Sequence, residues 1–475
     1  MNKKTVKIRM TQILMNKSKT HAIGPIISVA LLSFMGVLTE TSMNVTFPAL
    51  MKQFGVSLTT VQWVTTGYLL TVALLMITSA YLKRRFTNRL LFVTAALLFI
   101  IGDLLCALAP TFWLLLLGRL IQAGCVGLAA PLMVNIILDT VPRNKLGTYM
   151  GLANLIILIA PALGPTFGGT MVYLSDWRMI FWSTLPLAII LLLVGQGLIK
   201  QYTPTKRISF AWGQFVFLSI GLVSLIIGLN ELSSPSHYIR VLLYFSVTLI
   251  AFVIFGYWAK HSEKILFKLT VFKRSSFIYS FLPYVFLQFS NVGINFMLPN
   301  YVQMVNHASA FIGGLILFPG SLLNGFGQPV YGWLLDKYGG RLPLYLGNSL
   351  VLITAVLFML MGQQLTIIAV VVLYAIFSTG RSMAFSNSMT FGLKQLQKDE
   401  RNDANALYNT GQQVFGSIGT TLMAVLMMSV RWPQHTHVQN VALGSQIAFG
   451  LVGLLALLNV WFYRRLLKHE LKIVA

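Results

Sequence analysis

Apolar stretches long enough to cross a bilayer recur along almost the whole chain, and charged residues are confined to the short segments between them. Of the 475 residues, 56% are hydrophobic and only 10% are charged. A helix that spans a membrane needs ~20 mainly apolar residues, and a soluble domain does not have this composition. The chain is therefore predicted to be an all-α polytopic membrane protein with little length left for a soluble domain.

Fourteen segments qualify as membrane-spanning helices. They are 24–47, 61–82, 90–109, 113–137, 147–172, 179–199, 211–231, 239–259, 277–300, 310–334, 342–361, 365–391, 404–430 and 441–463. The grouping predicts a basic tail at 1–23, a six-helix bundle at 24–200, a linker with two extra helices at 201–274, a second six-helix bundle at 275–465 and a tail at 466–475. No small-residue cleavage pattern follows the basic tail, so it is expected to be retained rather than to be a signal peptide.

The positions of Lys and Arg predict the orientation. If the spans alternate in direction, 29 of the 35 Lys and Arg residues fall on the side of the two termini, and only four fall on the opposite side. Cytoplasmic loops carry this excess of positive charge, so both termini are expected to be cytoplasmic. The same placement explains the net charge of +24. A nucleic-acid partner is not expected, because no basic helix or interleaved aromatic platform is present.

The sequence does not indicate a metal site, a disulfide bond or a nucleotide-binding site. Cys106 and Cys125 lie inside apolar segments without metal-ligand spacing, and all seven histidines fall in tails or loops. No Gly-Lys-[Ser/Thr] phosphate loop occurs in the sequence. The chain is therefore not expected to be an enzyme or to bind a metal or another cofactor.

Four ionisable residues lie within the predicted spans: Glu40, Asp103, Arg119 and Arg381. A charge at the centre of a bilayer costs about 2.5–3.5 kcal/mol on insertion scales, so each residue is a candidate for function. Glu40 has Asn44 four residues later on the same helical face. A low-dielectric site disfavours an ionised carboxyl, so Glu40 is predicted to load and release protons and to contact substrate. A structural hydrogen bond to a neighbouring span is the alternative.

The other three residues each have two interpretations. Asp103, near the outer end of its span, either takes part in proton entry or is simply hydrated. Arg119 either pairs with Asp103 or Glu40 and tunes their proton affinity, or forms a structural ion pair. Arg381 either faces a cavity and receives anionic groups, or lies in a vestibule open to the cytoplasm.

Polar side chains form stripes on two later spans. One stripe recurs at helical spacing and comprises Tyr284, Gln288, Asn291 and Asn295. The other comprises Asn405, Asn409 and Gln412 or Gln413. Both stripes are predicted to contribute to substrate binding, although amides between spans also join helices to one another.

The fifth span carries a cluster of helix-distorting and small residues: Pro161, Gly164, Pro165, Gly168 and Gly169. Proline removes backbone hydrogen bonds and bends a helix, and small residues allow another helix to approach closely. The segment is therefore predicted to be a bent, tightly packed helix.

Two short basic loops indicate an internal repeat. The loop 82–89 includes Arg84, Arg85 and Arg89, and the loop 332–341 includes Asp336 and Arg341. Each joins the second and third helix of a six-helix half and is a candidate gating loop. Duplicated halves about a central cavity are the architecture of many secondary transporters.

These motifs resemble those of the major facilitator superfamily. The segment Gly164–Gly169 is similar to the antiporter signature of its fifth helices, which is associated with exporters, and Leu117–Gln122 is similar to the fourth-helix motif whose Arg is implicated in proton coupling. The segments Glu40–Pro48 and Leu298–Gln303 resemble the fourteen-span drug:proton antiporter branch, in particular lincomycin-resistance-type multidrug exporters. Commoner members carry Asp where this chain has Thr39.

Two motif copies depart from the family pattern. Ala123 stands in the fourth-helix motif where Gly is common. The first gating loop has Arg84 in place of the acidic residue and Thr87 in place of Gly. The usual charge contact between helices is therefore not carried over to that loop.

The resemblance implies the major facilitator fold and a proton-coupled antiporter that exports small lipophilic drugs or other amphipathic compounds by alternating access. The expected partners are a small-molecule substrate, protons and the lipid bilayer, and the expected state is a monomer in a bacterial cytoplasmic membrane, driven by the proton gradient without a cofactor. Antibiotic resistance would follow from such efflux. The alternative is an exporter of an endogenous metabolite, lipid or peptide, with drug efflux as a side activity.

Overall fold

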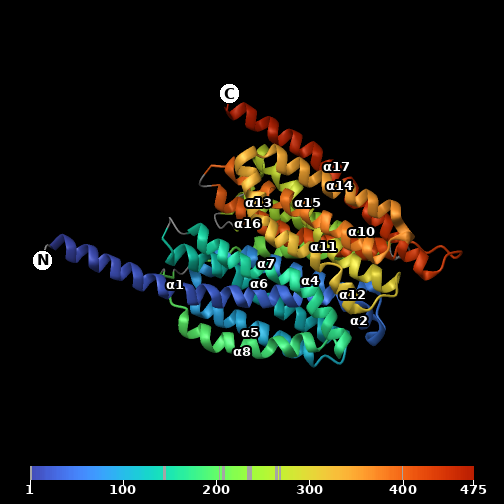
Figure 1. Ribbon diagram of the computed structural model, residues 1–475, viewed down its shortest axis with the longest axis horizontal. Helices are drawn as coiled ribbons and strands as arrows, with labels where there is room; N and C mark the ends of the chain where they lie inside the picture. The colour runs from blue at the N-terminus through green and yellow to red at the C-terminus, as the bar shows by residue number, and fades with distance from the viewer. Residues whose placement is uncertain are drawn as a thin grey trace.

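The computed structural model of the 475-residue chain describes all residues except 1–2, 143–145, 203, 206–208, 233–237, 263–265, 267–268, 398–399 and 475. Seven basic residues of the orientation argument lie outside the described residues: Arg143, Lys145, Lys206, Arg207, Lys264, Lys268 and Lys398. Throughout the described residues the regular structure is helical, as Figure 1 shows.

The helices are long and mostly follow the predicted spans. Those of the first half are α1 (Lys3–Ser42), η1 (Met43–Val45), α2 (Phe47–Phe54), α3 (Leu58–Val61), α4 (Trp63–Arg85), α5 (Asn88–Ala107), α6 (Phe112–Thr140), α7 (Leu146–Leu174) and α8 (Met179–Leu198). Two helices, α9 (Trp212–Glu231) and α10 (Tyr238–His261), form the extra pair. Those of the second half are η4 (Leu269–Lys273), α11 (Ser275–Met304), α12 (Ala310–Leu315), α13 (Phe318–Tyr338), α14 (Arg341–Met361), η5 (Gly362–Gln364), α15 (Ile367–Lys394), α16 (Arg401–Met427) and α17 (His437–Val474).

Thirteen helical segments in the described part are long and apolar enough to cross a membrane. The all-α polytopic fold is thereby confirmed. The other predicted span, 404–430, corresponds to α16, a 27-residue helix that packs against α11 and α4 but is too polar to qualify by composition. The total of fourteen spans stays a prediction.

Two predicted spans are interrupted in the structure. The span 24–47 ends as an α-helix at Ser42 and continues as a 3-10 turn, η1, before α2 starts with Pro48 in its first turn. The span 310–334 is divided into α12 and α13, and Pro319 stands in the first turn of α13. Proline lacks the N–H that a continuing helix needs but is well accommodated in a first turn. These prolines explain where the second segment begins.

The helices pack as two sets with the extra pair against both. In the first set α1 packs on α6, α7 and α8, and α5 packs on α6 and α8; in the second set α11 packs on α15, α16 and α17. Helices α9 and α10 pack on each other, and α9 also contacts α4 of the first set and α16 of the second. Much of α10 is exposed, including Leu242, Leu249 and Val253. This exposed apolar face agrees with a helix that borders lipid.

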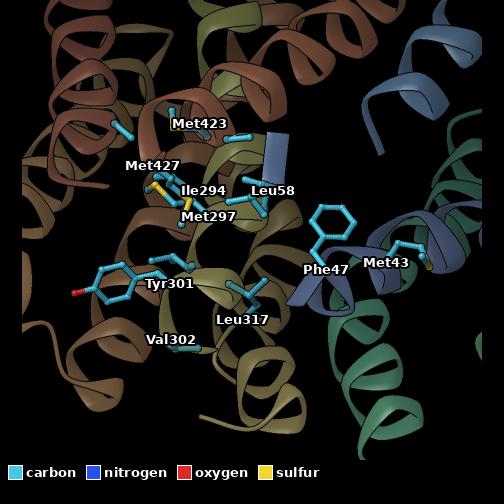
Figure 2. Packing of buried hydrophobic residues seen from close by; sticks show 14 of the residues in the cluster. Met43, Phe47, Leu58, Ile294, Met297, Tyr301, Val302, Leu317, Met423 and Met427 are labelled. Atoms are coloured by element: carbon cyan, nitrogen blue, oxygen red, sulfur yellow. The ribbon is translucent and has the colours of Figure 1, made fainter. Parts of the chain in front are cut away.

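The two sets are joined on the side away from the N-terminal end of α1, which we call the far side. An apolar cluster there combines Met43, Phe47 and Leu58 of the first set with residues of α11 and α16 and with Leu317, which immediately precedes α13 (Figure 2). The rings of Phe47 and Phe296 are 5.5 Å apart. Burial of these side chains stabilises the contact between the sets.

Hydrogen bonds add to this far-side contact. Asn300 donates to the backbone oxygen of Asn44 at 3.2 Å, and Gln303 donates to that of Val45 at 3.0 Å. A further hydrogen bond between the two sets joins α16 and α4: Ser417 donates to the backbone oxygen of Thr66 at 3.2 Å. All three hydrogen bonds join uncharged groups.

The glycine-rich part of α7 allows two neighbouring backbones to come close. A Cβ atom on Gly168 would lie 2.3 Å from the backbone oxygen of Ser42, and one on Gly169 would lie 2.5 Å from that of Ala310. Facing α7, a Cβ on Gly314 would lie 2.0 Å from the backbone oxygen of Pro165. The predicted close packing is confirmed, with α7 fitted between α1 and α12. Pro161 and Pro165 both lie inside the uninterrupted α7.

Away from these close contacts, α7 and α13 leave apolar side chains exposed. Leu152 and Leu155 of α7 are 46% and 49% exposed, and Leu323 and Phe326 of α13 are 52% and 79% exposed. The far half of α7 packs closely on α1 and α12 at Gly168 and Gly169, while Tyr173 and Leu174 at its end are 67% and 70% exposed.

We expect Gly168→Ala to lower the thermal unfolding temperature of the purified protein, because the added methyl group has to displace the backbone of α1. Overpacking of this kind costs about 1–3 kcal/mol. Gly151→Ala is the matched control in the same helix, since no atom lies within 4 Å of its Cβ position. Equal unfolding temperatures for the two variants would contradict the packing described for α7.

Candidate functional site

A fully buried arginine, Arg119, lies in the middle of the first set. Its neighbour Gly118 lets α6 approach α5, since a Cβ there would lie 2.7 Å from the sulfur of Cys106. The guanidinium carbon is 4.2 Å from the centre of the Tyr68 ring, and Nε donates to the backbone oxygen of Val64 at 3.4 Å. A cation over an aromatic face is stabilised electrostatically. Arg119 is thus held between α4 and α6.

The side-chain amide of Gln122 connects Arg119 to the carboxyl group of Asp103. Arg119 donates through Nη1 to Gln122, and Gln122 donates through Nε2 to Asp103 Oδ1. The backbones of α5 and α6 touch at this level, because a Cβ on Gly102 would lie 2.8 Å from Cα of Gln122. The predicted direct ion pair of Arg119 with Asp103 or Glu40 is wrong: none is found in the described part of the chain.

Asp103 is completely buried, and hydration is therefore excluded as an explanation for it. Its second oxygen accepts a hydrogen bond from Thr184 of α8 at 2.8 Å. Tyr68 in turn donates to the backbone oxygen of Gly36 in α1 at 3.0 Å. We call the chain from Tyr68 through Arg119, Gln122 and Asp103 to Thr184 the buried polar network; it links five helices, α1, α4, α5, α6 and α8.

Glu40 lies near this network but is not part of it. Its side chain is only partly buried, and it makes no hydrogen bond or ion pair to another described residue. Arg119 is the charge that acts on it electrostatically. The two carboxyl groups at membrane depth thus differ: Asp103 has two hydrogen-bond donors, and Glu40 has none.

Asn44 does not continue the helical face of Glu40, because α1 ends at Ser42 and Asn44 lies in η1. Its side-chain oxygen accepts from Thr65 at 3.0 Å, and its backbone oxygen accepts from Asn300. Asn44 is 3% exposed. The residue thus belongs to the far-side contact between the two sets.

The second set contains its own buried cation, Arg381 of α15, which is 7% exposed. Arg381 donates through Nη2 to the side-chain oxygen of Gln288 in α11. Its guanidinium carbon is 4.1 Å from the centre of the Phe385 ring, and the Tyr284 ring stacks on Phe385 at 4.1 Å with an angle of 16°. The arginine and two aromatic rings therefore form one stack between α11 and α15.

Some side chains in the polar stripe of α11 have hydrogen-bond partners on other helices, and one does not. Tyr284 donates to Gln412 of α16 at 2.8 Å, Gln288 accepts from Arg381, and Asn295 accepts from Tyr374 at 2.8 Å. Asn291 makes no hydrogen bond to another described side chain and is partly exposed.

On α16 the same division holds. Asn409 and Gln413 are partly exposed and make no hydrogen bond to other described side chains, whereas Gln412 accepts from Tyr284. Asn405 is exposed. The structure therefore separates amides that join helices from amides that are available to a ligand.

The gating-loop residues are at the near-side surface, where Arg84, Arg85, Arg89, Asp336 and Arg341 are all exposed. In the second half Asp336 pairs with Lys394 of α15 at 3.1 Å. In the first half Lys83 pairs with Asp139 of α6 at 3.4 Å. An ion pair thus joins α4 to α6 in the first half and the equivalent helices α13 and α15 in the second. In the first half the base is on the loop-side helix and the acid on its partner, and in the second half the order is reversed. The basic partner in the first half is Lys83 rather than Arg84.

Sequence reasoning missed several residues of these arrangements. Gln122 stands three residues after Arg119 on the same helical face, and this spacing was the available signal for it. Phe385 likewise follows Arg381 by one turn. Tyr68 and Thr184 come from other helices, and no local pattern identifies them.

Comparison with known proteins identifies the family. Residues 29–420 match the Major Facilitator Superfamily. The lincomycin resistance protein LmrB of Bacillus subtilis is 32% identical over 94% of this chain and 97% of its own length. LmrB of Listeria monocytogenes is 35% identical over 86% of this chain and 87% of its own. The putative multidrug resistance protein MdtD of Pectobacterium atrosepticum is 28% identical over 83% and 84%.

Solved structures agree on the fold. A bacterial homologue of the human lysosomal transporter Spinster superposes with a TM-score of 0.70 at 14% identity, covering 94% of this chain and 98% of that one. A D-xylose–proton symporter superposes with a TM-score of 0.66 at 16% identity, covering 92% and 97%. The chain therefore belongs to the major facilitator superfamily, a family of transporters rather than enzymes, and is an integral multi-pass membrane protein.

Proposed function

We propose that the protein is a proton-coupled antiporter that exports small lipophilic or amphipathic compounds from the cytoplasm of a bacterium. It acts as a monomer in the cytoplasmic membrane with both termini inside, and the proton gradient drives it without a cofactor. The names of its relatives, which concern lincomycin and multidrug resistance, support this substrate range. The distribution of Lys and Arg supports the orientation.

The carboxyl of Glu40, which has no fixed hydrogen-bond or ion-pair partner among the described residues, is the observation that carries the proposal. A proton carrier has to exchange its proton with water and with the substrate site, so its carboxyl cannot be occupied by fixed partners. Glu40 meets this condition among the described residues, whereas Asp103 does not. The positive charge of Arg119 lies close enough to interact with Glu40 electrostatically.

The buried polar network has a positioning role in this proposal. Arg119 is useful to Glu40 only if its guanidinium stays in place, and Gln122, which is itself bonded to Asp103, holds it there. An ionised arginine in a membrane interior is costly unless it is paired or hydrogen-bonded. Arg119 and Asp103 therefore act on proton coupling through Glu40, rather than as a second carrier.

The substrate is proposed to contact Glu40 together with the available amides of the second set, Asn291, Asn409 and Gln413. The remaining members of the predicted substrate set already have partners in the structure; they are Asn44, Tyr284, Gln288, Asn295 and Arg381. Those residues shape the site or exchange partners when substrate binds. Amides with free hydrogen-bonding groups suit varied amphipathic compounds, because they act both as donors and as acceptors.

Alternating access requires that the far-side contact between the two sets can open. With both termini inside, the far side faces outward, and its cluster and neutral hydrogen bonds form the closed external gate. Protonation of Glu40 on release of substrate then selects which side is open, as in other transporters built from two repeats. The glycines at 164, 168 and 169 let α7 form part of this gate.

We expect Glu40→Gln to abolish proton-driven transport. In vesicles containing the reconstituted protein and made acidic inside, the wild type accumulates ethidium when the pH gradient is imposed. The variant is expected to lose this gradient-dependent uptake by at least ~100-fold, the lower end of the range for loss of a proton-transfer group. Asp176→Asn is the control, since Asp176 pairs with Arg178 in a connecting loop.

Two outcomes would count against the proposal. Full gradient-dependent uptake by the Glu40→Gln variant would remove Glu40 as the proton carrier. Ethidium uptake by the wild type that is indifferent to the gradient would remove proton antiport itself.

We expect Gln122→Leu to destabilise the protein by about 1–3 kcal/mol, because Asp103 and Arg119 each lose a hydrogen bond in a buried site. Thermal unfolding of the purified protein measures this change. Gln196→Leu in α8 is the control, because Gln196 is partly exposed and makes no hydrogen bond to another described residue. A Gln122 variant as stable as the control would show that the network does not hold Arg119.

A further inference from the structure

The two halves of the molecule differ in buried charge. In the first set, Arg119 is accompanied by Glu40 and Asp103, so two acids and one base lie at membrane depth. In the second set, Arg381 is the base, and helices α11, α14 and α15 contain no Asp or Glu. The second set therefore holds a buried positive charge for which its own helices offer no counter-ion at that depth.

Acids at the near-side ends of neighbouring helices lie too far from Arg381 to serve, and Glu400 there pairs with Arg274 at 3.0 Å. Asp336 of α13 pairs with Lys394 at the near-side end of α15. Lys394 is thirteen residues after Arg381, which corresponds to about 20 Å along a helix axis. Asp403 lies in the first turn of α16, also at the near side. None of these acids reaches the middle of α15 from these positions.

The contacts of Arg381 hold the guanidinium in place but leave one of its N–H groups without a hydrogen-bond acceptor. Gln288 accepts one N–H, and the Phe385 ring covers one face at 4.1 Å. Phe385 is held in turn by Tyr284, which is tied to Gln412 of α16. Nε of Arg381 is buried and has no hydrogen-bond partner. An unpartnered N–H on a rigid, oriented arginine is the arrangement that a planar oxyanion completes.

Helix packing explains why Arg381 stands where it does. Its neighbour Gly380 lies against Gly347 of α14, and a Cβ on Gly380 would lie 2.6 Å from the backbone oxygen of Gly347. The next residue along the helix points about 100° away from that contact, which directs Arg381 toward α11. The glycine contact thus sets both the depth and the direction of the cation.

We propose that Arg381, positioned by Gln288 and Phe385, binds a carboxylate of the transported compound. This inference rests on the proposed function, since it places the anionic group at Arg381 while a cationic group of the same molecule meets Glu40. The preferred substrate class is therefore zwitterionic amphiphiles rather than simple lipophilic cations. Arg119 also has an unpartnered nitrogen, Nη2, but its side chain is 0% exposed whereas Arg381 is 7% exposed, so Arg381 is the more accessible of the two.

The test uses two dyes that differ only in this group: tetramethylrhodamine with a free carboxylate, and its ethyl ester. Binding of each to the purified full-length protein is measured by fluorescence anisotropy. We expect Arg381→Gln to weaken binding of the free-carboxylate dye by at least ~10-fold, as for loss of a charge-assisted hydrogen bond, and to change binding of the ester by less than about twofold. Arg381→Lys keeps the charge without the planar fork and is expected to be intermediate.

Arg240→Gln is the matched control, because Arg240 is exposed near the far-side end of α10. Binding of the ester also reports whether the Arg381 variant is folded. The proposal is overturned if both dyes lose affinity equally, if neither loses affinity, or if the wild type binds neither dye.

Failure of the proposed function is a separate result. Gradient-driven uptake of ethidium, which carries no carboxylate, reports on proton antiport. If the wild type fails that assay but binds the carboxylate dye through Arg381, the anion site stands without the antiporter. If it passes that assay and Arg381→Gln leaves both dyes unaffected, the antiporter stands without the anion site.

Discussion

The cost of burying charge in a bilayer determines where this chain carries its ionisable residues and how each is held. Nearly all Lys and Arg residues are outside the spans, and the four ionisable side chains at membrane depth are each placed differently. Arg119 and Asp103 are connected through a neutral amide, Arg381 is stacked on an aromatic ring, and Glu40 is left partly exposed. Glu40, which has no fixed partner, and Arg381, which keeps an unpartnered N–H, are the groups assigned to protons and substrate.

The closed seam and the charged groups are structurally connected. Glu40 is two residues from the end of α1, and the 3-10 turn that follows supplies the backbone oxygens to which Asn300 and Gln303 donate. The same end of α1 packs on Gly168 of α7. A change in charge at Glu40 is thus close to the contacts that would have to open on the far side, which gives proton binding a direct route to the gate.

Much of the fold was predictable, because spans and loops follow from hydropathy and charge, which are local properties of the sequence. The breaks at Pro48 and Pro319 were predictable in principle but were missed, since a hydrophobic window averages over a single residue. Burial of Asp103 was not predictable. Distance from the end of a span gives depth, but it does not tell which face of α5 is covered by Gln122 and Thr184. The mixed roles of the α11 stripe depended similarly on partners from α15 and α16.

The central claim is that a proton and the substrate compete for Glu40. It is tested most directly by following the pH of a weakly buffered solution of the purified protein while ethidium is added. If the account is correct, binding of ethidium releases protons from the wild type and none from the Glu40→Gln variant. Binding of ethidium to the wild type without any release of protons would contradict it.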